Sequence, residues 1–594
     1  MQGGFWLGCF YLQNFIFSLV NQKPLTQRGR LLIICSISLV LFGEKMAKEK
    51  KYDCIVIGSG PGGAPFAWRL ASKGMNVLVL EAGPRYNPYT DYPLNKKSWE
   101  LEGFPYRRKL KHVFGKRQRL DEGKKELRSW NRASGRLNPS NQRIYLAYHH
   151  VLGVGGSTLH FQGEAHRLHP SAFRMKSLFG VAEDWPISYE DLEPYYTEVE
   201  KIVGVAGPKE IPSRPRSSPY PLPPHKLSFA SQVIEKACKK LGLELIPNTV
   251  AILSRPYRNT PPCNYCNGCQ WGCPRKDKGS VDVTFIPLAE KTGRCKIVTD
   301  AFAGRIEIEK KDGVKRARGV VYYDRDGKEH FVEGSYVAVA CGAVETPRLL
   351  INSGINENGL VGKNFMETVF YEVVAFHPKR LDSYRGIPID SVIWKWNEPN
   401  PELGFKGGFR LYPTAGSAVG PINYALRFHK GWGEEFVKEV ERWFGHAIAI
   451  GGIGEFLPNG ETFVTVKEDT KDEFGLPVAL IQSALGESEI RMLEFMSKRA
   501  KEILKASGAE EIVEEFSSYD FFSATHVFGT CRMGKNPESS VVGPDLRSHE
   551  VGNLLITDAS VFPSSGGGDS PSLTIEALSL RAADLLLESL KKEG

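Results

Sequence analysis

The sequence has no hydrophobic run that is long and clean enough to cross a bilayer, which takes roughly 20 apolar residues. It also has no internal repeat and no low-complexity tract, which argues against repeat and fibrous architectures. Its 77 basic and 68 acidic residues leave a net charge of only +9 over 594 residues, too dilute to indicate a nucleic-acid binder. With 41% hydrophobic and 24% charged residues, the composition is that of a globular chain with room for more than one domain.

The cysteines do not form the even framework of a secreted disulfide protein. There are 11, an odd number, and four of them lie between Cys263 and Cys273 while the others are scattered. We therefore expect a reducing compartment, hence a cytoplasmic protein, or a local metal site. The basic segment, residues 107–119 with seven Lys or Arg residues, is expected to be a solvated loop, with docking of an acidic redox partner or of an anionic membrane surface as the alternative.

Residues 1–45 differ in composition from the rest of the chain. Two apolar stretches, residues 5–20 and 31–42, flank a polar break. The second stretch is too short to span a membrane and is followed by Gly43-Glu-Lys45, a poor signal-peptide cleavage site. We expect the protein to start at Met46, with a targeting or anchor segment as the alternative for residues 1–45.

A nucleotide-binding pattern follows Met46 closely. The apolar run Asp53-Cys-Ile-Val-Ile57 predicts a buried parallel strand, which leads into Gly58-Ser-Gly-Pro-Gly-Gly63. A helical stretch, residues 64–73, and a second strand, residues 76–80, come next. These segments predict a complete β-α-β unit.

The glycines of this unit have separate physical roles. Gly58 permits a tight turn, Gly60 lets the backbone approach a pyrophosphate, and Gly63 allows the helix and strand to pack closely. Glu81 ends the second strand, where a carboxylate can bind ribose hydroxyls. The pattern predicts dinucleotide binding but does not distinguish FAD from NAD.

Three later regions resemble the glucose-methanol-choline (GMC) oxidoreductases. Together with residues 52–84 they bracket almost the whole chain, and residues 184–196 resemble the branch of sugar and sugar-acid dehydrogenases and pyranose oxidases. The matching segments are residues 153–160 (Gly-Val-Gly-Gly-Ser-Thr-Leu-His), 526–534 (His-Val-Phe-Gly-Thr-Cys-Arg-Met-Gly), 553–563 and 571–575.

The resemblance implies an α/β fold with two domains. A split Rossmann-like domain binds FAD, and a substrate-binding domain of the α+β type contains an antiparallel sheet. We expect the FAD-binding domain at residues 46–170, 261–369 and 521–594, with the cysteine motif in its second part. The substrate domain is expected at residues 171–260 and 370–520.

Local patterns agree with this division. For the FAD-binding domain they predict strands at 336–340 and 553–557, a helix near 346–352 and a closing helix at 573–590. For the substrate domain they predict, within the antiparallel sheet, strands at 462–466 and 478–481, and a helix near 488–506.

The resemblance also assigns cofactor contacts. His160 matches a position where some family members attach FAD covalently, but many relatives have a histidine there without the bond. The expected FAD-binding residues are Gly58, Gly60, Gly63, Glu81, Gly155, Gly156, Ser157, Thr158, His160, Asp558 and Pro571.

His526 is the candidate catalytic base. Oxidation of an alcohol requires removal of the hydroxyl proton while a hydride leaves carbon for flavin N5, and histidine titrates near neutrality. The family partner position is a His or an Asn before a proline, whereas this chain has Ser570 before Pro571 and Asp569 one residue earlier. Either could hydrogen-bond the substrate hydroxyl, and a carboxylate beside His526 would raise its pKa. The alternative is that Asp569 caps the last helix.

The cysteine motif has the spacing of bacterial ferredoxins. Cys263-x2-Cys266-x2-Cys269-x3-Cys273 is followed by a proline, as in iron-sulfur ligation. Structural thiols without metal and a zinc site are the alternatives.

An iron-sulfur cluster would draw electrons toward a cytochrome or quinone and make the enzyme a dehydrogenase. The sequence thus predicts an FAD-dependent oxidoreductase that acts on an alcohol, polyol or sugar. A peroxide-forming alcohol oxidase and a non-redox flavoprotein lyase of the same fold remain the alternatives.

Overall fold

A computed structural model describes residues 51–95, 112–114, 118–127, 142–414, 425, 427–429 and 431–593. Residues 1–45, the expected start at Met46 and most of the basic segment lie outside the described residues. Within the described part of the chain, no helix combines the length and apolar character needed to cross a membrane.

A parallel β-sheet forms the centre of the cofactor half. Its five parallel strands lie in the order β6, β2, β1, β9, β20, and β8 and β7 extend it with antiparallel pairing. The sheet therefore joins strands from both ends and the middle of the sequence. The strand bounds are β1 Tyr52–Ile57, β2 Val77–Leu80, β6 Cys295–Val298, β7 Phe302–Lys311, β8 Val314–Tyr323, β9 Glu329–Val339 and β20 Leu554–Ile556.

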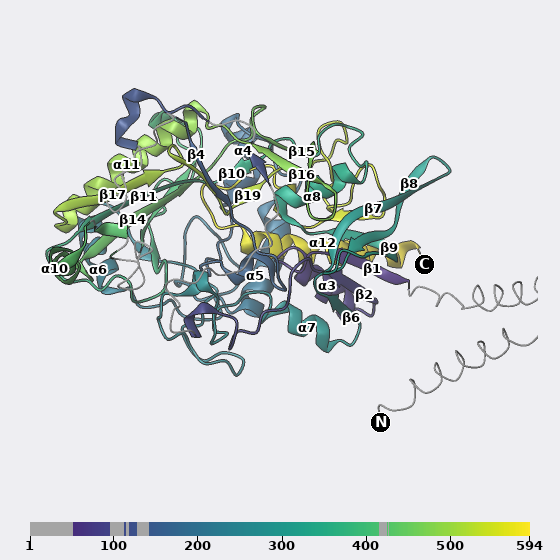
Figure 1. Ribbon diagram of the computed structural model, residues 1–594, viewed down its shortest axis with the longest axis horizontal. Coiled ribbons are helices and arrows are strands. Elements are labelled where there is room, and N and C mark those ends of the chain that lie inside the picture. Colours follow the sequence, from purple (N-terminus) through teal and green to yellow (C-terminus); the bar gives the residue numbers. More distant parts are fainter. Residues whose placement is uncertain are drawn as a thin grey trace, which may run out of the picture. The chain divides into compact units, whose positions relative to one another are not determined.

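The predicted β-α-β unit is present. Helix α3, Gly63–Ser72, connects β1 to β2 and ends before Gly74, whose positive φ of 101° stops the helix. Its apolar face packs against α12, Ser572–Glu593, and α7, Phe285–Lys291. The first helix and the last helix of the described chain therefore lie side by side, next to the parallel sheet (Figure 1).

The antiparallel sheet predicted for the substrate domain is also present. Its strands lie in the order β13, β14, β11, β17, and α11 packs on β11, β13 and β14. The bounds are β11 Val369–Phe376, β13 Phe409–Thr414, β14 Ala447–Gly454, β17 Glu511–Ser517 and α11 Glu487–Ser507.

Two predicted strands belong elsewhere. β15, Phe463–Lys471, and β16, Pro477–Gln482, pair with one another and with β3, Val113–Phe114, in a separate sheet, so the prediction that they join the substrate sheet is wrong. They pack on α8, Gly342–Asn352, which begins four residues before the predicted 346. A strand pattern shows that a segment pairs but not with which partner.

Short paired strands and helices complete the described chain. Two of the pairs, β10 with β19 and β18 with β4, flank His526 and fix its position. The remaining bounds are β4 Ile144–Tyr148, β5 Ile246–Pro247, β10 Met366–Glu367, β12 Ser391–Val392, β18 Phe521–Ala524, β19 Val527–Phe528, α4 Met175–Phe179, α5 Tyr189–Val203, α6 Phe229–Lys240 and α10 Gly433–Trp443.

Candidate cofactor and active site

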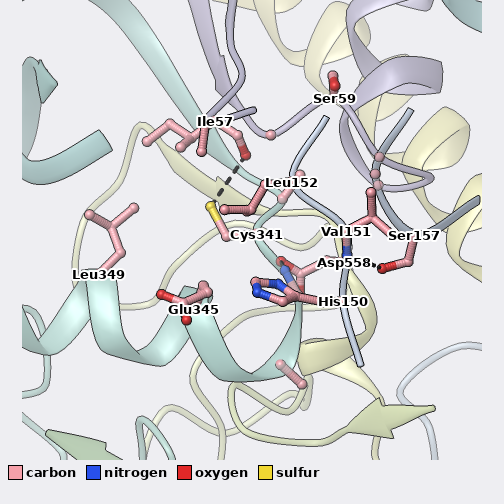
Figure 2. A pocket seen from close by; sticks show the side chains of 18 of the residues that line it. Ile57, Ser59, His150, Val151, Leu152, Ser157, Cys341, Glu345, Leu349 and Asp558 are labelled. Atoms are coloured by element: carbon pink, nitrogen blue, oxygen red, sulfur yellow. Dashed lines mark hydrogen bonds between the residues drawn. The ribbon is translucent and has the colours of Figure 1, made fainter. Parts of the chain in front are cut away.

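One cavity is lined both by the nucleotide-binding motif and by the candidate base. Its wall includes Gly58 and Gly60 after β1, Glu81 after β2, Gly342 after β9, and His526 before β19. Figure 2 shows Ile57, Cys341 and Asp558, from three segments far apart in the sequence, around this cavity, with the Cys341 thiol donating to the Ile57 carbonyl. The carboxyl ends of parallel strands thus form its floor.

The glycines are required by close backbone contacts. Gly58 has a φ of 97°, and a Cβ there would lie 2.5 Å from the Ala340 oxygen. A Cβ on Gly63 would lie 2.0 Å from the Gly58 oxygen. Gly60 faces Gly156, where a Cβ would lie 2.8 Å from the Gly60 Cα. The two glycine segments therefore meet at the cavity, and no side chain can separate them.

Glu81 is held by four donors. Its Oε2 accepts hydrogen bonds from the Ser59 amide and hydroxyl at 3.0 and 2.6 Å, and its Oε1 accepts from the amides of Gly83 and Gly153 at 2.9 and 3.0 Å. Burial raises the pKa of Glu81, and these hydrogen bonds oppose that effect. The carboxylate therefore holds the two glycine segments together. A hydroxyl of a bound ribose would donate to the same carboxylate that accepts from the Ser59 hydroxyl.

The other expected cofactor residues fall into two groups. The cavity is lined by Gly156, Ser157, Asp558 and Pro571. Gly63, Gly155, Thr158 and His160 are not among the described residues that line it. Asp558 accepts hydrogen bonds from the Gly342 amide at 3.0 Å and from the Thr346 hydroxyl at 2.6 Å, so it fixes the start of α8. The Thr158 hydroxyl donates to the Gly155 carbonyl at 2.7 Å, within its own loop.

These residues fit FAD. The backbone of residues 60–62 at the N-terminus of α3 faces the cavity, where the helix dipole favours a pyrophosphate. Gly60 and Gly156 both line the cavity and have no side chain that would keep a ligand from the backbone. The residues that would hold FAD are Gly58, Ser59, Gly60, Gly62, Glu81, Gly156 and Ser157.

His526 is part of the wall of the same cavity. The Thr368 amide donates to the His526 carbonyl at 3.3 Å, and the Thr368 hydroxyl lies 3.5 Å from the His526 Nδ1. Desolvation lowers the pKa of His526 to about 4; Glu164 opposes this effect and Arg410 adds to it. The imidazole is therefore neutral at pH 7 and able to accept a proton.

Glu164 and Arg410 form a buried ion pair that sequence reasoning missed. Arg410 Nη1 and Nη2 donate to the two Glu164 oxygens at 2.8 and 2.7 Å, and Arg410 Nε donates to the Gly568 carbonyl at 2.7 Å. The pair therefore affects the pKa of His526 and also holds the loop that carries Asp569. The one sequence signal was the run Glu164-Ala-His-Arg-Leu-His169, polar residues directly after a cofactor motif.

Asp569 is paired with an arginine. Arg214 Nη2 donates to Asp569 Oδ1 at 2.6 Å and to Asn397 Oδ1 at 2.8 Å. Burial raises the pKa of Asp569, and Arg214 opposes the rise. The Ser570 amide donates to His166 Nδ1 at 3.0 Å. Neither Asp569 nor Ser570 is among the described residues that line the cavity.

The four motif cysteines lie in one loop region, and the negative charges of the other three raise the pKa of Cys269. Burial raises the pKa of Cys263 to about 12 and that of Cys273 to about 11. Among the described residues, no three of these thiols have sulfur atoms within 4.8 Å of one another. A tetrahedral zinc site would bring sulfur atoms to about 3.8 Å, so the arrangement does not fit one zinc ion. The nine described cysteines are all free thiols.

Lys278 joins the cysteine loop to the cofactor loop. Its Nζ donates to the carbonyls of Leu159, Phe161 and Cys269 at 2.9, 3.0 and 2.9 Å, and the residue is only 1% exposed. Three acceptors require three protons, so the side chain is an ammonium ion. Leu159 and Phe161 flank His160, and the Val281 amide also donates to the Thr158 hydroxyl.

Comparison with known proteins agrees with this geometry. Two profiles described as GMC oxidoreductase match residues 176–369 and 458–579, and a profile described as NAD(P)-binding Rossmann-like domain matches residues 56–87. The chain is 30% identical over 575 residues to the fructose dehydrogenase large subunit of Gluconobacter japonicus, covering 91% of this chain and 98% of that protein. It is 31% identical over 558 residues to 2-methyl-1,2-propanediol dehydrogenase of Mycolicibacterium austroafricanum, covering 90% and 95% of the two chains.

A solved structure shows the same fold. Formate oxidase of Aspergillus oryzae superposes with a TM-score of 0.62 at 17% identity, covering 92% of this chain and all of that one. The two proteins thus share the fold of this chain. The identity and coverage of the two dehydrogenases establish that the chain belongs to the GMC oxidoreductase family, as an FAD-dependent oxidoreductase that acts on CH–OH groups.

Proposed function

We propose that this chain is an FAD-dependent dehydrogenase that oxidises a CH–OH group of a sugar, a polyol or a related alcohol. The observation that carries the proposal is that His526 and the nucleotide-binding residues Gly58, Gly60 and Glu81 line one cavity. Both relatives named above are dehydrogenases of hydroxyl compounds. Residues 46–170, 261–369 and 521–594 are proposed to build the cofactor domain, and residues 171–260 and 370–520 the substrate domain.

His526 is proposed to take the substrate hydroxyl proton. Its neutral imidazole can accept a proton at pH 7, and the backbone pairing of Thr368 with His526 fixes its position. The negative charge of Glu164 favours the imidazolium that forms when the proton arrives. Bound FAD supplies the hydride acceptor.

Ser570 is the better supported partner for the substrate hydroxyl. The Asp569 carboxylate is neutralised by Arg214 at 2.6 Å. Among the described residues, the hydrogen bond of Ser570 is the one that its backbone amide donates to His166. Ser570 directly precedes Pro571, which lines the cavity, and its hydroxyl, which can donate or accept, is proposed to orient a substrate hydroxyl beside His526. Asp569 is proposed to hold the glycine loop through Arg214.

The cysteine motif is proposed to bind an iron-sulfur cluster. The positive charge of Lys278 lies beside Cys269 and Cys273 and opposes the rise that burial causes in the pKa of both thiols. A cluster there would supply one-electron transfer to an external acceptor, a cytochrome or a quinone. The link from Cys269 through Lys278 to the loop beside the cofactor cavity supports a short path between the two groups.

A partner subunit is proposed on the basis of one relative, which is named as a large subunit. Such a subunit would bind near the cysteine loop, because Cys266 is the exposed member of the motif. Co-purification of the full-length chain with the products of neighbouring genes would test this proposal.

The test of the proposed function is anaerobic reduction of the purified flavoprotein by a panel of sugars, polyols and simple alcohols. We expect at least one alcohol to bleach the flavin absorbance. His526→Ala should slow the bleaching by about 10²- to 10⁴-fold with unchanged FAD content, because it removes the base. His330→Ala is the matched control, since His330 pairs with Asp324 on the surface.

Two further measurements distinguish the dehydrogenase from the oxidase and the non-redox flavoprotein, and a third tests the iron-sulfur cluster. Peroxide formed at the turnover rate in air would make the enzyme an oxidase, and flavin reduced by dithionite but by no alcohol would make it a non-redox flavoprotein. Iron and acid-labile sulfide, at about three or four irons per chain, would support the cluster. Protein handled without oxygen that contains FAD and no iron would refute it.

A further inference from the structure

We propose that His112, His150 and Glu345 bind one divalent first-row transition-metal ion at the wall of the cavity. The proposal goes beyond the alcohol oxidation proposed above and does not depend on it. One ligand atom from each of the three residues lies within 4.8 Å of the other two. Figure 2 shows the side chains of Glu345 and His150 next to one another at the cavity.

The geometry is close to that of a single-ion site. An ion with ligand bonds of about 2.1 Å places tetrahedral ligand atoms about 3.4 Å apart. The His112 Nε2 lies 3.2 Å from the Glu345 Oε1. Two imidazoles and one carboxylate are the donor set of Zn²⁺, Fe²⁺ and Mn²⁺ sites that keep open positions.

The atoms that face the proposed ion are buried and lack hydrogen bonds. The side chains of His112 and Glu345 are 8% and 11% exposed. Within the described part of the chain, both ring nitrogens of His112 and the Oε1 of Glu345 lack a hydrogen-bond partner. Buried polar atoms without partners are rare in folded proteins, and a bound ion is one of the few arrangements that satisfies them together.

The surroundings hold the ligands in place. Arg348 Nη1 donates to the second carboxylate oxygen of Glu345 at 3.1 Å, and Arg348 is itself anchored by Asp472 and by the Pro477 carbonyl. Such outer contacts orient ligands in metal sites. Glu345 and Asp472 together carry two negative charges and Arg348 carries one positive charge, so the group has a net negative charge that favours a cation.

Aromatic packing fixes the two imidazoles. Tyr148 stacks on His150 at 4.8 Å between ring centroids and meets His112 edge-on at 5.4 Å. His150 and Glu345 line the cavity, whereas His112 is not part of the described lining. The open positions of the ion therefore face the cavity, where water or a ligand oxygen can complete the coordination.

The experiment uses Mn²⁺ and the full-length, FAD-loaded protein after chelator treatment. Mn²⁺ prefers nitrogen and oxygen ligands, so the cysteine motif competes poorly for it. Free Mn²⁺ is counted by room-temperature EPR during a titration. We expect one bound Mn²⁺ per chain, with nitrogen couplings from coordinated imidazole in the pulsed EPR spectrum of the bound ion.

Glu345→Gln and His112→Ala should each weaken Mn²⁺ binding at least tenfold, while the surface control His330→Ala binds as the wild type does. FAD content and thermal unfolding are measured for each variant. If His112→Ala fails to fold, two measurements still test the proposal. Glu345→Gln keeps the size of the side chain, and the imidazole signal of the wild type needs no variant. Absence of bound Mn²⁺, binding unchanged in Glu345→Gln, or a bound ion without imidazole coupling would overturn the proposal.

Discussion

Glu455 should make the folded protein less stable as the pH rises. This carboxyl group follows β14, is fully buried and, among the described residues, accepts two long hydrogen bonds, from the amides of Gly408 and Gly566 at 3.4 and 3.3 Å. Burial raises its pKa from 4.5 to about 7, and the negative charges of Asp569 and Glu489 add to the rise. The group is therefore protonated in the folded state at a pH where the unfolded chain has released the proton.

The sign and size follow from linkage. The folded-state pKa is the higher one, so the stability that Glu455 contributes is complete below pH 4.5 and is lost as the pH rises through 7. A difference of about 2.5 pKa units is worth about 3 kcal/mol, because one unit is about 1.4 kcal/mol. About 2.5 kcal/mol of this amount is lost between pH 5 and pH 8.

The assay compares wild type and Glu455→Gln by urea unfolding at pH 5, 6, 7 and 8. The variant does not titrate at this position, so its stability relative to wild type should rise by about 2.5 kcal/mol across this range. Glu468→Gln, at a side chain that is 78% exposed, is the control and should track the wild type. Parallel pH profiles of wild type and Glu455→Gln would refute the reasoning, because they would mean that Glu455 is ionised in both states.

Three further predictions concern buried contacts. Lys278→Met should destabilise the fold by about 3 kcal/mol or more, because three buried carbonyls lose their donor, while the exposed Lys239→Met should change the unfolding free energy by less than about 0.5 kcal/mol. Asp569→Asn should cost about 3 to 5 kcal/mol in urea unfolding by leaving Arg214 buried without its counter-ion, and an added Arg214→Met should restore part of that loss. Gly63→Ala should lower the flavin absorbance per chain, because the new Cβ would lie 2.0 Å from a backbone oxygen, whereas Gly460→Ala, where a Cβ meets nothing within 4 Å, should not.

The elements that the sequence predicted best are those whose pattern is local. The first strand, the helix after the glycine motif, the long helix α11 and the closing helix α12 lie within three residues of their predicted bounds. The partners of β15 and β16 were wrong because alternating apolar residues show a buried face but not the neighbouring strand. Their sheet is completed by β3, more than 360 residues earlier in the chain, through the pairing of Leu480 with Val113.

The same limit applies to the candidate site. The glycine motifs and His526 were predictable because their chemistry is carried by neighbours in the sequence, and the cavity brings them together. The ion pairs were not, because Arg410 and Glu164 are 246 residues apart and Arg214 and Asp569 are 355 residues apart. From sequence alone, Asp569 and Ser570 are equal candidates to meet the substrate. Because Arg214 neutralises Asp569, we propose that this carboxylate holds the loop in place and that the hydroxyl of Ser570 meets the substrate.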